Sequence, residues 1–204
     1  VPPIDKRIID QINKTHYSEI NFSRNDSIIS VVDEKVENKF KKLSIKTAKI
    51  GQSDRSKLGI VFTALHGTSY KLIPDLLQSS GFSNVNFVKN QMIPDGDFKN
   101  VNSSNPEDPS SLEQAINLAK KFKSDLVIGT DPDADRFGIA VKNNKDEYVP
   151  INGNQAMVVM TDYILGKKIN LKNKFIASTV VSTTMMDKVA QLNNILLFKS
   201  LTGF

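Results

Sequence analysis

Short apolar runs rich in β-branched residues alternate along this chain with longer segments in which apolar residues recur every three or four positions. The short runs predict buried strands, and the longer segments predict helices with one apolar face. Between residues 58 and 141 the predicted strands are Leu58–Thr63, Val85–Val88, Asp125–Gly129 and Phe137–Val141. Helical segments separate the first three strands, and this β-α-β-α-β order predicts a mainly parallel, doubly wound α/β sheet with helices on both faces.

The segments on either side of this region have a similar pattern. Isoleucines at 4, 8, 9 and 12 predict a short helix, and Ile28–Val32 predicts a strand ahead of a lysine-rich helix. From Glu147 on, residues 152–154 predict a turn and helix cap, and residues 175–181, 183–192 and 195–198 predict a strand, a helix and a strand. We therefore expect residues 1–27 to be the end of a preceding domain with a linker, residues 28–146 to form an α/β domain, and residues 147–204 to begin a second, similar α/β domain.

Three aspartates at every second position follow the third predicted strand: Asp131, Asp133 and Asp135, closed by Arg136. Carboxylates this close repel one another unless a cation lies between them, and an all-oxygen ligand set selects Mg²⁺ or Mn²⁺ before zinc. A solvated acidic turn is the alternative, but ligand loops of open α/β sheets lie at the carboxyl ends of strands, as this loop does. An EF-hand calcium loop does not fit, because Arg136 and Lys142 stand where it requires glycine and glutamate. The loop predicts a metal site.

A second candidate loop, His66-Gly67-Thr68, follows the Leu58–Thr63 strand and precedes a helix. Parallel strands bring their carboxyl ends to one edge of a sheet, so we expect this loop to open on the same side as the aspartate loop. A lone histidine is more often structural than functional. The glycine beside His66 and the helix amino terminus after it suit an anion, which makes the pair a candidate for substrate binding.

Composition narrows the classes of function. The net charge of +5 comes from lysines scattered over 204 residues, without an arginine-rich cluster, and therefore does not favour nucleic-acid binding. The chain has no cysteine, which excludes disulfides and thiolate metal sites. No apolar run approaches the ~20 residues that a membrane span needs, and no signal peptide opens the chain. We expect a cytoplasmic protein that does not bind a membrane.

The chain resembles the α-D-phosphohexomutases, the phosphoglucomutase and phosphomannomutase family, over nearly its whole length. The matching stretches are Val1–Lys6, Phe62–Thr68, Gln91–Phe98, Asn105–Glu107, Thr130–Arg136, Asn152–Gln155 and Leu201–Phe204. The aspartate loop and the His-Gly loop at this separation form a specific combination. Proteins of this family have four domains, and the resemblance implies that this chain is a fragment holding the end of the first domain, all of the second and the beginning of the third.

The resemblance implies a reversible phosphoryl shift on hexose phosphates. In such enzymes a phosphoserine donates its phosphoryl group to the sugar phosphate, a hexose bisphosphate forms and reorients, and the other phosphoryl group returns to the serine. The three aspartates match the family's Mg²⁺ ligands, one ion per active site. Arg136 matches an arginine that would bind phosphoryl or sugar oxygens, and Thr202 and Gly203 match a third-domain loop that contacts the phosphosugar.

Departures from the family pattern limit what this chain does alone. Ala64 stands where proline is common, and Ser69 where glycine is common. The phosphoserine motif Thr-Ala-Ser-His-Asn-Pro does not occur in the chain, nor do the third-domain sugar-selecting loop and the fourth-domain phosphate clamp. We therefore expect the isolated chain to bind metal weakly at best and to be inactive, because no transfer starts without the nucleophile, and to depend on the missing mutase domains.

Two alternatives remain open from the sequence. One is an aspartyl-phosphate phosphatase of the haloacid dehalogenase type, in which Asp131 itself is the nucleophile and is trappable with beryllofluoride. The other is a non-catalytic homologue or scaffold that keeps the fold without the activity. The choice between glucose and mannose, or a pentose, is not encoded in these residues.

Overall fold

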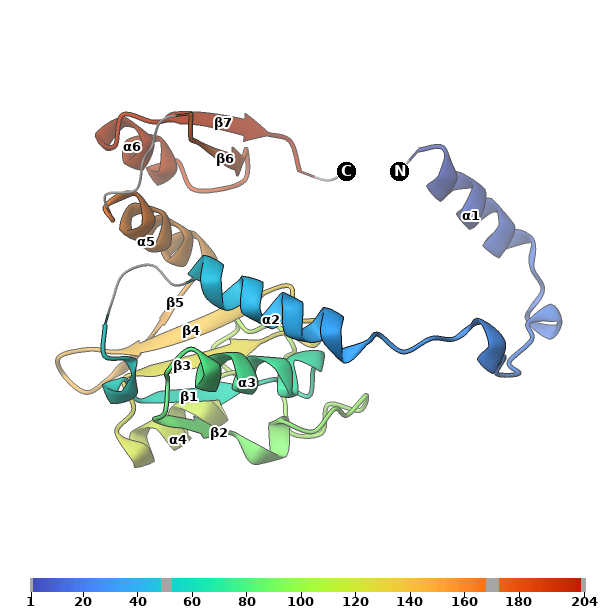
Figure 1. Cartoon of the computed structure of the whole chain (residues 1–204), viewed down its shortest axis with the longest axis horizontal. Helices are drawn as coiled ribbons and strands as arrows, with labels where there is room; N and C mark the ends of the chain where they lie inside the picture. Colours follow the sequence, from blue (N-terminus) through green and yellow to red (C-terminus); the bar gives the residue numbers. More distant parts are fainter. Residues whose placement is uncertain (1, 49–52, 168–172, 203–204) are drawn as a thin grey trace.

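A five-stranded sheet forms the centre of the computed structural model, which describes residues 2–48, 53–167 and 173–202 (Figure 1). Its strands are β1 (Ile60–Thr63), β2 (Val85–Phe87), β3 (Leu126–Thr130), β4 (Phe137–Lys142) and β5 (Tyr148–Ile151). They lie in the order β2-β1-β3-β4-β5, with β1 parallel to β2 and β3, and with β4 antiparallel to β3 and β5. Only β4 therefore opposes the common direction, which confirms the predicted mainly parallel α/β sheet.

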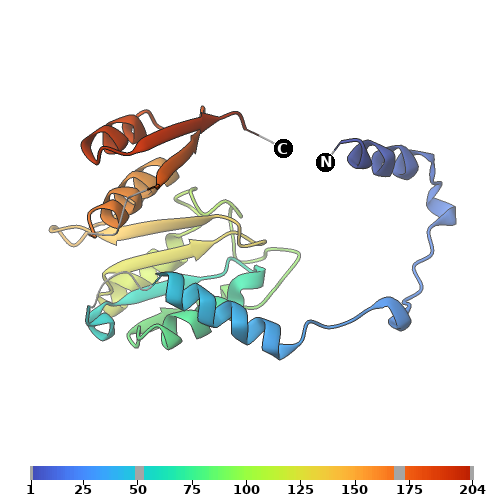
Figure 2. The same ribbon diagram turned by 45° about the horizontal axis from the view of Figure 1, so that its top comes forward.

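The helices that connect the parallel strands cover both faces of the sheet. α3 (Leu72–Ser79) joins β1 to β2, and α4 (Glu113–Phe122) joins β2 to β3. Because β2 and β3 flank β1 on opposite sides, right-handed crossovers place α3 and α4 on opposite faces (Figure 1 and Figure 2). α2 (Glu34–Ala48) lies beside α3, where Lys41 pairs with Asp75 at 2.9 Å. The core beneath α4 consists of Val61, Val88, Leu112, Ala115, Ala119, Val127 and Ala140.

The amino-terminal segment forms only part of what its pattern predicts. α1 (Ile4–Lys14) is the predicted short helix, and in Figure 1 it lies apart from the sheet. The strand predicted at Ile28–Val32 is wrong, because Asp26–Ile28 form a 3-10 turn and Val31 is 93% exposed. A strand needs a neighbour that satisfies its backbone hydrogen bonds, and none of the described strands lies beside this segment.

The remaining residues form a second, smaller unit. α5 (Gly153–Leu165) is followed by β6 (Phe175–Thr179), α6 (Met185–Leu192) and β7 (Leu196–Ser200). β6 and β7 are parallel neighbours, as the predicted strand-helix-strand order requires. β5, which lies within the predicted part 147–204, pairs with β4 and is the last strand of the first sheet.

The α-helices of these ranges are short. The longest of them, α2, has 15 residues, fewer than the ~20 that cross a bilayer. Within the described ranges, no helix combines the length and the apolar character that a membrane span requires.

Candidate active site

The aspartate loop, residues 131–136, connects β3 to the antiparallel β4. Thr130 and Phe137 are opposite one another in the ladder, so the loop reverses the chain directly. The Asp131 N–H donates to the Arg136 carbonyl at 3.2 Å, and the Ala134 N–H donates to the Asp131 carbonyl at 3.0 Å. Ala134 adopts a left-handed conformation with φ of 62°. This tight turn fixes the spacing of the acidic side chains.

The three predicted metal ligands converge in the structure. One carboxylate oxygen from each of Asp131, Asp133 and Asp135 lies within 4.8 Å of the other two. Oxygens around a single Mg²⁺ at 2.0–2.1 Å lie up to about 4.2 Å apart. Asp131 is buried while Asp133 and Asp135 are exposed, so small rotations of the two exposed side chains suffice to close this set around one ion. The donors are all hard oxygens, which fit Mg²⁺ or Mn²⁺.

Asp131 is held by Arg136. The Arg136 backbone N–H donates to Oδ1 of Asp131 at 3.0 Å, and the guanidinium Nε donates to Oδ2 at 2.9 Å. Burial alone raises the pKa of Asp131, but these hydrogen bonds and the positive charge outweigh it and hold the pKa below its ordinary value. A fully buried carboxylate that is engaged through both oxygens is a poor nucleophile, which argues against the aspartyl-phosphate phosphatase alternative.

The pKa of Asp135 is shifted in the opposite direction from that of Asp131. The adjacent carboxylate of Asp131, together with desolvation and the nearby charge of Asp133, raises the pKa of Asp135 above its ordinary value. Arg136 Nε lies 3.5 Å from Oδ1 of Asp135, and this attraction lowers the pKa of Asp135 but does not outweigh the neighbouring carboxylates. Three carboxylates therefore compete for one arginine, and a divalent cation would relieve that competition.

His66 lies in the loop that follows β1 and is almost entirely buried, with 5% of its surface exposed. Its backbone N–H donates to the Gln91 carbonyl at 2.8 Å, and Nδ1 lies 2.7 Å from the Ile93 carbonyl, which makes Nδ1 the protonated nitrogen. Nε2 is buried without a hydrogen-bond partner among the described residues. The ring therefore ties the β1 loop to the segment after β2, as the structural alternative for a lone histidine predicts. Its predicted role in substrate binding stays a prediction.

The predicted meeting of the two loops is confirmed. A Cβ added at Gly67 would lie 2.5 Å from the Cα of Pro132, so only glycine permits this approach. The Thr68 N–H donates to the Pro132 carbonyl at 2.8 Å. Beside this contact, the buried hydroxyl of Ser69 bonds to the hydroxyl of Thr130 at 2.6 Å. Pro132 and Ser69 were not among the predicted site residues, because their roles depend on partners more than sixty positions away.

The predicted carboxy-terminal site residues are less defined. Thr202 is exposed and follows β7, the last strand of the second unit. Gly203 lies outside the described residues. Their contact with a phosphosugar therefore remains a prediction.

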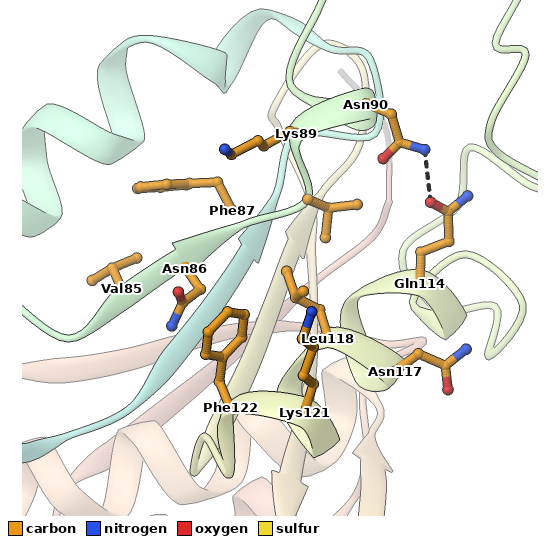
Figure 3. A pocket seen from close by; sticks show the side chains of 11 residues that line it. Val85, Asn86, Phe87, Lys89, Asn90, Gln114, Asn117, Leu118, Lys121 and Phe122 are labelled. Atoms are coloured by element: carbon orange, nitrogen blue, oxygen red, sulfur yellow. Dashed lines mark hydrogen bonds between the residues drawn. The ribbon is translucent and has the colours of Figure 1, made fainter.

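Several hollows lie on the described surface, and one of them adjoins the aspartate loop. A cleft of ≈ 460 Å³ runs from Asp135, Arg136 and Phe137 to one side of α5, and so adjoins the aspartate loop. A groove of ≈ 880 Å³ lies between β2 and α4, where the Asn90 side chain donates to Gln114 at 2.9 Å (Figure 3). None of the predicted site residues lines this groove, so the cleft beside the aspartates is the hollow relevant to the site.

Comparison with known proteins matches this architecture to one family. Residues 38–145 match the model of the phosphoglucomutase/phosphomannomutase alpha/beta/alpha domain II, and residues 152–204 match that of domain III. A phosphoglucomutase of Staphylococcus aureus (strain USA300) is 41% identical over 155 residues, which cover 76% of this chain and 28% of that protein. The chain thus spans little more than a quarter of the length of this relative.

Solved structures show the same fold. A phosphoglucomutase/phosphomannomutase family protein from Burkholderia thailandensis aligns with a TM-score of 0.66 at 18% identity, over 82% of this chain and 33% of that one. A variant N-acetylphosphoglucosamine mutase from Aspergillus fumigatus, solved in complex with glucose 1,6-bisphosphate, aligns with a TM-score of 0.51 at 13% identity, over 81% of this chain and 32% of that one.

Proposed function

Since this chain belongs to the phosphoglucomutase/phosphomannomutase family, we propose that it is the central, metal-binding portion of a mutase that interconverts hexose 1-phosphate and hexose 6-phosphate. The reaction would proceed through a phosphoserine enzyme and a sugar bisphosphate. The observation that carries this proposal is the convergence of three carboxylates on one loop, in contact with the Gly67 loop.

The proposed metal ligands are Asp131, Asp133 and Asp135, which would hold one Mg²⁺. The ion would neutralise charge on the transferring phosphoryl group and orient it. Asp131 is buried and bonded to Arg136, so this ligand is fixed in position. Asp133 and Asp135 are exposed, so their side chains can adjust to the ion.

Arg136 would bind the phosphosugar. Its Nε is engaged by Asp131, but the side chain is 61% exposed. No hydrogen bond among the described residues uses its terminal Nη groups. The two terminal groups can therefore bind a phosphoryl or sugar oxygen while Nε keeps the arginine in place. Arg136, held in place by Asp131, would thus bind the substrate next to the ion.

The two halves of the candidate site would have different tasks. Gly67 permits the close approach of the β1 loop, and His66 would act as a positioning residue that ties this loop to the segment after β2. Thr202 and Gly203 would contact the sugar from the second unit. Hexose phosphates and a hexose bisphosphate are the proposed substrates, and the glucose 1,6-bisphosphate bound to the Aspergillus relative supports that class.

Calorimetric titration of glucose 1,6-bisphosphate into the chain, with and without Mg²⁺, tests this proposal. We expect binding that requires Mg²⁺ and weakens about tenfold in Arg136→Lys, because lysine cannot engage Asp131 and a phosphoryl group together. Arg24→Lys, an exposed arginine paired with Asp26, serves as the matched control. Binding that ignores both Mg²⁺ and Arg136 would favour the non-catalytic alternative.

A further inference from the structure

A rigid turn places Glu107 between the two units. The buried Ser111 hydroxyl lies 2.6 Å from the carbonyl oxygens of both Ser103 and Asn105, which share its one hydrogen. Pro106 is fully buried, and a Cβ at Gly138 of β4 would lie only 2.0 Å from its carbonyl oxygen. The backbone on either side of Glu107 is therefore fixed to β4, the strand that leaves the aspartate loop.

From this fixed backbone the Glu107 side chain reaches the second unit. Its Oε1 accepts a hydrogen bond from the Gly153 N–H, the first residue of α5, at 2.6 Å. At the start of α5, Asn152 and Gln155 form a capping box with hydrogen bonds of 2.9 and 3.0 Å. Glu107 thus bonds an N–H that the cap does not use, and its negative charge suits the amino end of the helix.

The position of α5 determines the shape of the cleft beside the candidate site. Asp135, Arg136 and Phe137 line one side of this cleft, and Ala156, Met157 and Met160 of α5 line the other. Glu107 lies in the same lining. A change in the direction of α5 would therefore widen or close the space next to the aspartate loop.

We propose that Glu107 is a positioning residue that fixes the amino end of α5, and with it the second unit, relative to the aspartate loop. That this fixes the substrate cleft rests on the proposed mutase function, whereas the coupling between Glu107 and α5 does not. Gly153 is part of the same contact, because a Cβ added there would lie 2.7 Å from Oε1 of Glu107.

Spin labels measure the coupling directly, because the chain has no cysteine of its own. Labels on cysteines introduced at the exposed Asn117 of α4 and Asp162 of α5 report the distance between the sheet and α5. We expect Glu107→Ala to broaden the distance distribution and to speed hydrogen exchange of the Gly153 amide about tenfold, the effect of losing one hydrogen bond to a charged acceptor. Glu107→Gln keeps the Oε1 acceptor and should restore both readouts.

A double-mutant cycle separates the contact from a general loss of structure. Gly153→Ala should displace the flexible Glu107 carboxylate and so broaden the distance distribution as Glu107→Ala does, but should have no further effect in Glu107→Ala, where its Cβ meets no carboxylate. An unchanged distribution in Glu107→Ala, or failure of Glu107→Gln to restore it, would overturn the proposal. Mg²⁺ affinity, measured on the same samples, should stay within about twofold, because the bond of Glu107 is to α5 and not to the ion. Absence of Mg²⁺ binding in the wild type would count against the proposed function alone.

Discussion

Replacing Gly67 by alanine tests the contact between the two loops of the site. The added Cβ would lie 2.5 Å from Cα and 2.6 Å from the carbonyl oxygen of Pro132, and 2.8 Å from the carbonyl oxygen of Ala64. Favourable carbon contacts begin near 3.5 Å, so the two loops must separate by about 1 Å. All three neighbouring atoms belong to the backbone, and rotation of a side chain cannot relieve the overlap.

The magnitude follows from two terms. Overpacking against backbone costs about 1–3 kcal/mol, and separation of the loops weakens the hydrogen bond from the Thr68 N–H to the Pro132 carbonyl, worth about 1 kcal/mol. We therefore expect Gly67→Ala to lower the free energy of unfolding by about 2–4 kcal/mol. Many domains retain their fold after such a loss, since they are stable by about 5–15 kcal/mol.

Urea unfolding followed by circular dichroism measures this difference, with Gly96→Ala as the control. A Cβ at Gly96 meets no atom within 4 Å, and we expect a change of less than about 0.5 kcal/mol there. Mg²⁺ affinity should fall in Gly67→Ala as well, because Pro132 lies between two of the proposed ligands. Equal stabilities of the two variants would refute the loop contact on which the site is built.

Three further outcomes are expected. Ser69→Ala should cost about 1–2 kcal/mol in the same urea experiment, because it leaves the buried Thr130 hydroxyl without its partner, whereas Ser69→Thr should keep the bond if the methyl group is accommodated. Mg²⁺ affinity, measured by calorimetry from pH 7 downward, should be highest at neutral pH and should decline as the pH falls through the raised pKa of Asp135, since protonation removes a ligand. The decline should begin at a higher pH than an ordinary aspartate would give. An affinity that does not change with pH would contradict the role of Asp135 as a ligand. The isolated chain should show no mutase turnover in a coupled assay, because its 204 residues contain no phosphoserine motif, and turnover by the purified chain would overturn that expectation.

The first strand of the central sheet was predictable because it is a compact apolar run that is buried on both faces. Ile60–Thr63 is buried at every position, and its composition alone favours a strand. The aspartate loop was predictable for a different reason, since the spacing of its acidic residues carries the chemistry whatever the exact turn. The structure adds the burial of Asp131 and its two bonds to Arg136.

The errors and omissions have physical causes. β5 contains Pro150, which is uncommon within strands, but β5 is an edge strand and tolerates a residue without an N–H. Ile28–Val32 has a strand-like composition, but none of the strands in the described part of the chain lies beside it. In both cases the presence or absence of a neighbouring strand decides whether the segment forms a strand, and that neighbour is not part of the local sequence. The hydroxyl pair of Ser69 and Thr130 was missed for the same reason.

Binding of Mn²⁺, followed by electron paramagnetic resonance and competed with Mg²⁺, tests most directly whether the aspartate loop is a metal site. We expect one Mn²⁺ per chain, displaced by Mg²⁺ and lost in Asp133→Asn. Binding should be retained in Asp97→Asn, which changes an exposed aspartate paired with Lys99 outside the candidate site. Asp133→Asn leaves the bonds between Asp131 and Arg136 in place, so the loop should keep its fold while it loses a ligand. No uptake by the wild-type chain, or equal uptake by Asp133→Asn, would show that the aspartate loop is not a metal site.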